Sequence, residues 1–316
     1  MTSAVKMEVE LAPGAKRSLV LPNPVLVASG TFGYGLDYQK VFDIQRLGGI
    51  VTKTTTLAPR RGNAAPRIAE VPGGMLNSIG LQNIGVGALV RELAPVYETW
   101  QVPVIVSIMG FTVGEYAEVA ARLEGVAGFS GVELNLSCPN TERGGIEFGQ
   151  EPDAAADVVR RVMRATTLPV IAKLTPNVTD PKPVAKAVVD SGAHALCVGN
   201  TLVGMAMDRE RGRPAIAATY AGLSGPALKP VQLRQVYELA GAVDAPIIGC
   251  GGVMTAEDAV DYLMAGACAV QVGTATFANP LAPIEVLDGI ERYCCEHGVA
   301  DVSELVGAGR SKAKGT

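Results

Sequence analysis

Eight short apolar segments, rich in Val and Ile, recur along the chain and restrict its fold more than any other feature. They are continuous rather than alternating, which is typical of strands buried on both faces of a parallel sheet. The segments are Pro24–Ala28, Gly49–Lys53, Pro103–Ile108, Gly131–Leu136, Pro169–Leu174, Ala195–Gly199, Pro246–Gly249 and Ala267–Val272. Helical patterns lie between most of them, at Val113–Gly125, Asp153–Thr167, Pro181–Ser191, Ala227–Gly241, Thr255–Ala265 and Pro283–His297.

Eight strands with intervening helices predict an α/β fold, a closed (β/α)₈ or TIM barrel. The main rival is an open doubly wound sheet, which should show G-x-G-x-x-G after its first strand. The glycines of Ser29–Gly35 do not have that spacing. The barrel is therefore the preferred interpretation.

The domain organisation is predicted to be simple. A length of 316 residues suits one barrel, and no low-complexity linker divides the chain, so residues 1–316 are expected to form a single domain. Residues 1–22 are predicted to form a hairpin, with Met7–Leu11 and Arg17–Leu21 flanking a turn at Ala12–Ala15. Residues 307–316 are expected to form a flexible tail.

Composition argues against several classes of function. The net charge is −4 and no long basic run occurs, which disfavours nucleic-acid binding. The longest apolar stretch, Val102–Phe111, is too short to cross a bilayer, and charges at Lys6 and Glu8 interrupt any signal-peptide core, so a cytoplasmic protein is expected. The two histidines and six cysteines show no paired ligand spacing, so no metal site is predicted and any iron–sulfur cluster must lie on another protein.

Active sites of such barrels lie at the carboxyl ends of the strands, which selects candidate residues. Gly249–Val253 and Gly273–Ala275 end the last two strands, where barrels commonly bind phosphate through backbone N–H groups. This pattern indicates FMN or a phosphorylated substrate without choosing between them. The alternative is that these glycines only relieve crowding at turns.

Two lysines, Lys53 and Lys173, end apolar strands at the same mouth. Because burying an ammonium group is costly, a lysine at such a position suggests a function. It could form a Schiff base, hold a phosphate or stabilise a reduced flavin anion. The alternative is a surface lysine whose stem alone is buried.

Long polar loops at this mouth, Thr54–Gln82, Ser137–Gln150 and Thr201–Pro226, are expected to carry further candidates. Cys138 lies in the loop Asn135–Asn140 (Asn-Leu-Ser-Cys-Pro-Asn), where a thiol could act as a nucleophile or a general base, or be inert. Amide side chains, which offer both donors and acceptors, suit a planar ring with C=O and N–H edges, although any one of them could simply form a turn. They are Asn77, Asn83, Asn135, Asn140, Asn177 and Asn200.

In order along nearly the whole chain, these motifs resemble those of the dihydroorotate dehydrogenase family. They are Ala28–Gly33, Lys53–Thr56, Asn77–Asn83, Asn135–Asn140, Lys173–Val178, Asn200–Thr201, Gly222–Pro226, Gly251–Gly252 and Gly273–Thr274. The Asn-Leu-Ser-Cys-Pro-Asn segment is the most specific of them. The resemblance implies one FMN per chain and oxidation of dihydroorotate to orotate in pyrimidine synthesis.

The resemblance also implies a role for each matching residue. Cys138 would be the general base, and Lys173 would stabilise negative charge at the flavin's pyrimidine edge. Substrate contacts are expected from Lys53, Asn77, Ser78, Ile79, Gly80, Leu81, Asn135, Asn140, Asn200 and Thr201. FMN contacts are expected from Ser29, Lys53, Thr54, Ser107, Asn135, Lys173, Gly199, Gly225, Gly251, Gly252, Gly273 and Thr274. Ser107 is a departure, because the family often has Asn there.

Within the family, Cys138 and the motifs Asn77–Asn83, Lys173–Asn177 and Leu223–Pro230 look like class 1B. That class implies a homodimeric core and a heterotetramer with a second subunit, which carries FAD and a [2Fe–2S] cluster and passes electrons to NAD⁺. Three alternatives remain: the fumarate-using class, a dihydropyrimidine dehydrogenase-like FMN subunit, and a Schiff-base lyase using Lys173 or Lys53. A non-enzymatic scaffold subunit is a further reading.

Overall fold

A closed barrel of eight parallel strands forms the centre of the molecule. The computed structural model describes residues 5–137 and 147–310. The barrel strands, in the order in which they pair, are β10 (Ala195–Val198), β15 (Ile247–Cys250), β16 (Ala269–Val272), β3 (Val25–Val27), β4 (Gly49–Val51), β7 (Val104–Ile108), β8 (Gly131–Asn135) and β9 (Val170–Leu174), which returns to β10. Each lies within or next to a predicted apolar segment, so the predicted barrel is confirmed.

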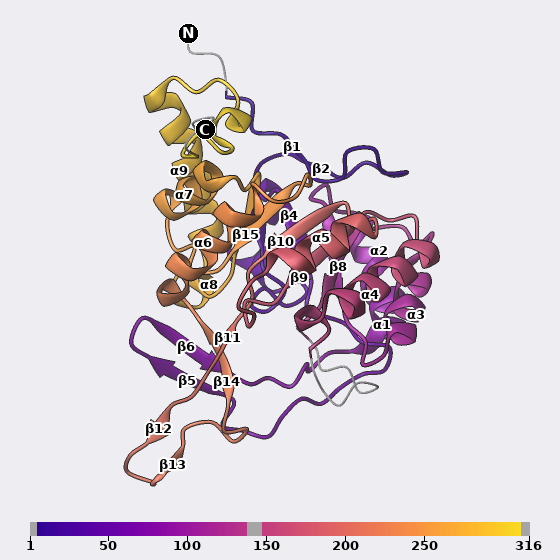
Figure 1. Ribbon diagram of the computed structural model, residues 1–316, viewed down its shortest axis with the longest axis vertical. Coiled ribbons are helices and arrows are strands. Elements are labelled where there is room, and N and C mark those ends of the chain that lie inside the picture. Colours follow the sequence, from indigo (N-terminus) through magenta and orange to yellow (C-terminus); the bar gives the residue numbers. More distant parts are fainter. Residues whose placement is uncertain (1–4, 138–146, 311–316) are drawn as a thin grey trace.

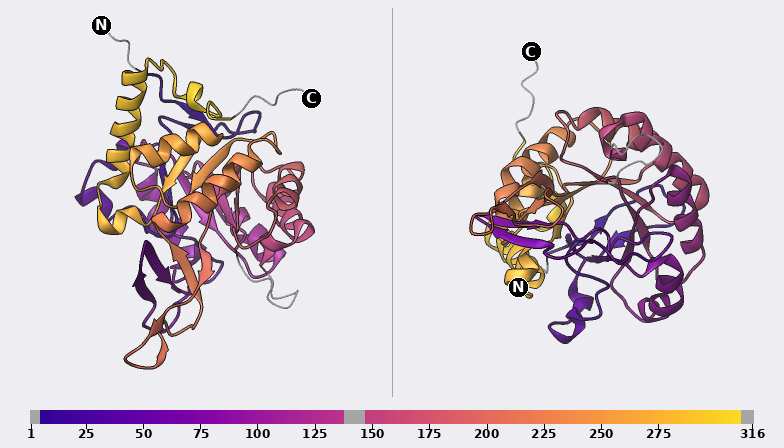
Figure 2. Two further views of the ribbon diagram at one scale, coloured as in Figure 1. Left: turned by 60° about the vertical axis from the view of Figure 1, so that its left-hand side comes forward. Right: turned by 90° about the horizontal axis from the view of Figure 1, so that it is seen from below.

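Helices surround the barrel as an outer layer, which Figure 2 shows as a ring in its right-hand view. The layer contains α3 (Val113–Leu123), α4 (Pro152–Ala165), α5 (Lys182–Asp190), α6 (Lys229–Leu239), α7 (Ala256–Ala265) and α9 (Ala282–His297), all six close to their predicted ranges. Sequence signals fix their starts. Thr112 caps α3 by accepting a hydrogen bond from the Glu115 backbone, and Thr255 with Asp258 forms a capping box at α7.

The predicted N-terminal hairpin is present as β1 (Val9–Glu10) and β2 (Val20–Leu21). Its Leu19 and Leu21 side chains are buried and lie close to Gly131 and Gly49, the first residues of two barrel strands. The hairpin therefore covers the amino-terminal end of the barrel and leaves the carboxyl ends of the strands to the site.

The expectation of a flexible tail from residue 307 is not supported for residues 307–310. Gly307 and Gly309 donate backbone hydrogen bonds to Leu263 and Met264, and the Arg310 guanidinium bonds the carbonyl of Ala265. These contacts tie the segment to the end of α7. Residues 311–316 lie outside the described part of the chain.

Insertions at the carboxyl ends of the strands contain structure that the sequence analysis treated as loops. A four-stranded antiparallel sheet is built from β5 (Ile68–Val71), β6 (Gly74–Asn77), β11 (Leu202–Gly204) and β14 (Ala221–Ser224), and β12 (Met207–Asp208) with β13 (Arg213–Pro214) forms a small hairpin. Figure 1 shows both projecting from one end of the barrel, away from the two termini.

Several short elements complete the described chain. They are α1 (Gly85–Ala88), a π-helical turn η3 (Leu89–Leu93), α2 (Ala94–Tyr97), α8 (Ala275–Ala278), and the 3₁₀ turns η1 (Tyr38–Lys40), η2 (Ile44–Arg46), η5 (Phe148–Gln150), η6 (Pro226–Leu228) and η7 (Val302–Leu305). No helix among the described residues has the length and apolarity needed to cross a membrane.

Candidate active site

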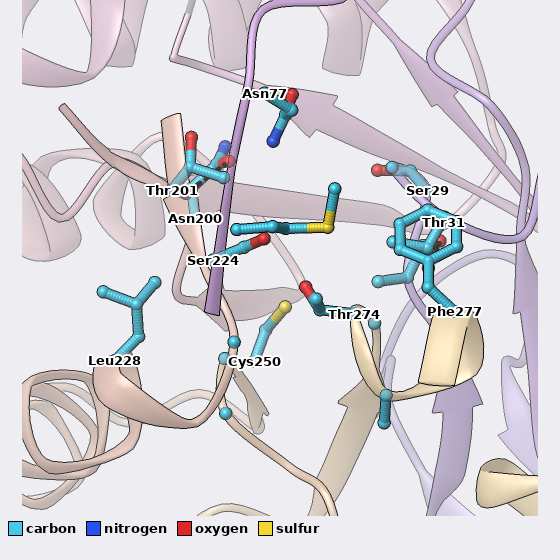
Figure 3. A pocket seen from close by; sticks show the side chains of 18 of the residues that line it. Ser29, Thr31, Asn77, Asn200, Thr201, Ser224, Leu228, Cys250, Thr274 and Phe277 are labelled. Atoms are coloured by element: carbon cyan, nitrogen blue, oxygen red, sulfur yellow. Dashed lines mark hydrogen bonds between the residues drawn. The ribbon is translucent and has the colours of Figure 1, made fainter. Parts of the chain in front are cut away.

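A cavity lies between the carboxyl ends of the barrel strands and the projecting sheet. Barrel loops supply Ser29, Lys53, Asn200 and Thr274, and the projecting sheet supplies Asn77. Figure 3 shows Ser29, Asn77, Asn200, Thr201, Ser224, Cys250, Thr274 and Phe277 arranged around this space. The remaining lining residues are Ala28, Gly30, Thr31, Ile68, Met75, Ile79, Asn135, Lys173, Gly225, Leu228, Gly251, Gly252, Val253, Met254, Gly273 and Ala275. Residues far apart in sequence therefore meet where the strand-end rule predicts.

The two predicted lysines both line the cavity, in different electrostatic settings. Burial lowers the pKa of Lys53, whose ammonium group has no hydrogen-bond or acidic partner among the described residues. Lys173 donates to Gln271 Oε1 at 2.9 Å, and its Nζ lies 3.6 Å from Glu133 Oε1. Lys53 is thus a half-buried cation available to a bound anion, while Lys173 is held from within the barrel.

Burial opposes protonation of Lys173, but its neighbours reverse that effect. Negative charge on the Cys197 and Cys250 sulfurs and on the Glu133 carboxylate raises the pKa of Lys173 above the ordinary lysine value despite desolvation. Burial raises the pKa of Cys197, whereas a hydrogen bond with Cys197 and the charge of Lys173 lower the pKa of Cys250 to about 7. Lys173 is consequently a fixed cation at the floor of the cavity.

Amide and hydroxyl groups form a connected set on one wall. The Asn200 side-chain amide donates to Asn135 Oδ1 at 3.2 Å and to Ser137 Oγ at 2.9 Å, and Asn200 Oδ1 accepts from the Thr201 backbone. Behind them, the fully buried Gln232 donates to the Asn200 carbonyl oxygen at 2.8 Å. These bonds fix polar groups at the cavity, where a ring with donors and acceptors on its edges could bind.

Bare glycine backbone forms another part of the cavity lining. Gly251 and Gly252 have φ angles of +122° and +70°, and a Cβ at Gly252 would lie 2.7 Å from the Lys229 backbone nitrogen. Gly225, with a φ of +111°, approaches the backbone of Gly74 so closely that a Cβ would lie 2.6 Å from its Cα. Only glycine fits these positions, so backbone groups rather than side chains are presented to a ligand.

Most predicted site residues are brought together, and some are not. Those that line the cavity are Ser29, Lys53, Asn77, Ile79, Asn135, Lys173, Asn200, Thr201, Gly225, Gly251, Gly252, Gly273 and Thr274. Ser78, Gly80, Leu81, Thr54, Ser107 and Gly199 do not line it. Ser107 is fully buried and shares a 3.0 Å hydrogen bond with Thr54, so both support the strand ends from behind. Cys138 and Asn140 lie outside the described residues, and their roles stay predictions.

Two residues that hold Lys173 were not predicted from the sequence. Glu133 and Gln271 lie inside otherwise apolar strands, and both are fully buried. Their polarity at inward-facing positions was an available signal, because an unexplained polar residue in a buried strand needs a partner. Phe277 and Ile68, which are 55% and 52% exposed, also line the cavity and carried no comparable signal.

Comparison with known proteins agrees with this geometry. The family model described as dihydroorotate dehydrogenase matches residues 17–293. A protein of Geobacter sp. (strain M21), named dihydroorotate dehydrogenase B (NAD(+)), catalytic subunit, is 50% identical over 294 residues, covering 93% of this chain and 96% of its own. Proteins with the same name from Desulforudis audaxviator and Desulforamulus reducens are 53% and 51% identical, covering 92% and 90% of this chain and 94% of their own in each case. The chain belongs to the dihydroorotate dehydrogenase family.

Proposed function

We propose that this protein oxidises dihydroorotate to orotate with FMN as its cofactor, in de novo pyrimidine biosynthesis. The observation that carries the proposal is one cavity lined by two lysines, several amide side chains and bare glycine backbone. The names of the relatives, which are catalytic subunits of dihydroorotate dehydrogenase B, support the same activity.

The cavity residues fit FMN. Gly251, Gly252, Gly273 and Thr274 would hold the phosphate through backbone N–H groups, as barrels commonly do at this position. Lys173 would lie at the pyrimidine edge, where a fixed cation favours the reduced, negatively charged form. When bound, FMN supplies the chemistry of accepting a hydride from a substrate carbon.

The substrate would occupy the space between the amides and Lys53. Asn77, Asn135, Asn200 and Thr201 offer donors and acceptors to the ring edges, and the Lys53 ammonium would bind the carboxylate. Since Lys53 is half-buried without an acidic partner among the described residues, an anionic substrate would relieve an unfavourable charge. This arrangement predicts selectivity for a dihydropyrimidine that carries a carboxylate.

We assign the proton transfer to Cys138. Its thiolate would take a proton from the carbon next to the ring carbonyl while a hydride leaves the neighbouring carbon, and a C=C bond forms between them. Support comes from its position three residues after Asn135, which lines the cavity at the end of β8. A general base has to come within hydrogen-bond reach of the carbon it deprotonates.

A Schiff-base lyase is less well supported. Such a reaction needs a neutral amine as nucleophile. The pKa of Lys173 is raised, which keeps it protonated, whereas the pKa of Lys53 is lowered. Lys53 is therefore the one candidate for that alternative, and borohydride trapping of a carbonyl substrate on Lys53 would reveal it.

The proposal extends to a partner. A second subunit with FAD and a [2Fe–2S] cluster would carry electrons from this chain to NAD⁺, in a heterotetramer built on a homodimer of this chain in the cytoplasm. The printed names of the relatives include NAD(+) and the word subunit, which support a separate electron-transfer protein. The projecting strands and the segments that join them expose apolar side chains, including Val203, Met205, Met207 and Tyr220, as an interaction surface would.

Turnover by the isolated chain with an artificial electron acceptor tests the activity. Dihydroorotate should be oxidised, and dihydrouracil, which lacks the carboxylate, should be a much poorer substrate. Preference for dihydrouracil would instead support a dihydropyrimidine dehydrogenase-like activity. Lys53→Met should raise KM for dihydroorotate more than KM for dihydrouracil if Lys53 binds the carboxylate.

A further inference from the structure

Three polar side chains form a closed set inside the barrel, directly beneath the cavity. Glu133 comes from β8, Lys173 from the adjacent β9, and Gln271 from β16, which lies farther round the barrel. Gln271 Nε2 donates to Glu133 Oε2 at 2.7 Å, and Gln271 Oε1 accepts from Lys173 Nζ at 2.9 Å. The amide of Gln271 thus bridges an acid and a base that are 3.6 Å apart.

Burial makes each of these polar groups unfavourable unless all three are present together. Glu133 and Gln271 are fully buried, and Lys173 is 4% exposed. An isolated ion in such surroundings would carry a large desolvation penalty, so each charge depends on the other. One oxygen of Glu133, Oε1, has no hydrogen-bond partner among the described residues, so its interaction with Lys173 is one of charge.

The three residues occupy different layers. Lys173 lines the cavity, whereas neither Glu133 nor Gln271 does. Cys197 and Cys250 are the other titratable side chains beside Lys173, from β10 and β15. A core that needed only to be filled could use apolar side chains here, as the inward positions of these barrels usually do. The set therefore places a countercharge below the lysine and leaves the lysine facing the cavity.

We propose that Glu133, through Gln271, is a positioning residue that keeps Lys173 charged and aimed at the bound flavin, and so raises the flavin's tendency to be reduced. The inference rests on the proposed function, because it takes FMN as the occupant of the cavity. Glu133 does not touch the cofactor in this account. Its effect passes through the Lys173 ammonium, which stabilises negative charge on the reduced ring.

The test compares the reduction of bound FMN in Glu133→Gln and wild-type protein, by equilibration with a reference dye. At the potential where half of the wild-type flavin is reduced, the ratio of reduced to oxidised flavin should fall about tenfold or more in the variant. The reason is that Lys173 loses its buried charge partner, and the loss of such a partner commonly costs more free energy than a tenfold change in an equilibrium requires. Glu124→Gln removes the same charge from the surface and should leave the ratio unchanged. An unchanged or higher ratio in Glu133→Gln overturns the proposal.

A double-mutant cycle separates positioning from direct action. Lys173→Met should lower the ratio, and adding Glu133→Gln to it should lower the ratio no further. An equal additional decrease would show that Glu133 acts without Lys173, which would overturn the proposal. If Glu133→Gln does not fold, Gln271→Met removes the bridge and keeps both charges, and it should lower the ratio to a smaller extent. No change in a folded Gln271→Met variant would likewise count against it.

The proposed function and the role of Glu133 can be refuted separately. If wild-type protein binds no FMN, the proposed function is wrong. If wild-type protein binds FMN and is reduced by dihydroorotate while Glu133→Gln keeps the wild-type ratio, only the role of Glu133 is wrong.

Discussion

Replacement of Gly199 by alanine should be among the most damaging single changes near the site. Gly199 directly follows β10 and has a φ of +130°, and an added Cβ would lie 1.7 Å from the carbonyl oxygen of Cys250. Real Cβ atoms do not approach backbone atoms that closely, so the two strand ends would have to separate by more than an ångström. The unfavourable φ costs roughly 1–3 kcal/mol and the overpacking a similar amount, which gives a loss of about 2–6 kcal/mol in the free energy of unfolding.

Urea unfolding followed by circular dichroism measures this loss, and Gly212→Ala is the matched control. Gly212 has a φ of +62° but nothing within 4 Å of an added Cβ, so it should lose only the roughly 1–2 kcal/mol of a left-handed backbone. Movement at Gly199 would also displace Asn200, whose amide bonds Asn135 and Ser137. KM for dihydroorotate should therefore rise in Gly199→Ala alone. Equal destabilisation of the two variants would refute the reasoning from close backbone approach.

Three further predictions concern single side chains. Cys138→Ala should retain FMN and lose roughly 10²- to 10⁴-fold in turnover, because the proton acceptor is gone; full activity would exclude Cys138 as the base. Gln232→Leu should raise KM for dihydroorotate roughly fivefold or more with FMN affinity unchanged, since the Asn200 carbonyl loses its 2.8 Å donor; a wild-type KM would count against this support. Hydrogen bonds from Thr166 and Thr167 lower the pKa of Glu124 from 4.5 to about 2, so its contribution to stability is present above pH 4.5 and lost as the pH falls toward 2. Chemical unfolding should show that Glu124→Gln destabilises the protein at pH 7 and that the difference shrinks over that range; a pH-independent difference would contradict this.

The barrel was predictable because its strands are buried on both faces. Segments such as Val104–Ile108 and Val170–Leu174 are almost wholly apolar and are buried along their whole length, so helices must cover one face while the barrel interior covers the other. The strand-end rule then located Lys53, Asn135, Lys173 and Asn200 around one cavity.

The projecting sheet could not be read in the same way. Ile68–Val71 alternates between exposed and half-buried positions, and Gly74–Asn77 begins with glycine, so neither has the hydrophobic pattern of a core strand. Gly74–Asn77 pairs locally with Ile68–Val71, but its other edge pairs with Ala221–Ser224, more than 140 residues away along the chain. Local sequence contains no record of such long-range pairing. Ile68 and Met75, which line the cavity from this sheet, were therefore not predicted, although Asn77 was.

The group of polar side chains around Lys173 was predicted only in part. Its lysine was predicted from position, but its dependence on Glu133 and Gln271 requires knowledge of which strands face each other across the barrel. For Ser107, the resemblance predicted a contact with the flavin. In the structure its side chain is hydrogen-bonded to Thr54 inside the cavity wall. Its contact with FMN stays a prediction.

The most direct test of the central claim is an anaerobic visible spectrum of the purified chain, recorded before and after addition of dihydroorotate. The account predicts a flavin absorption band that bleaches on addition, which would demonstrate the cofactor, the substrate and the reductive half-reaction together. A band that persists with dihydroorotate but bleaches with dihydrouracil would contradict the assigned substrate. A colourless protein that cannot be reconstituted with FMN would contradict the assigned cofactor and return the Lys53 lyase to consideration.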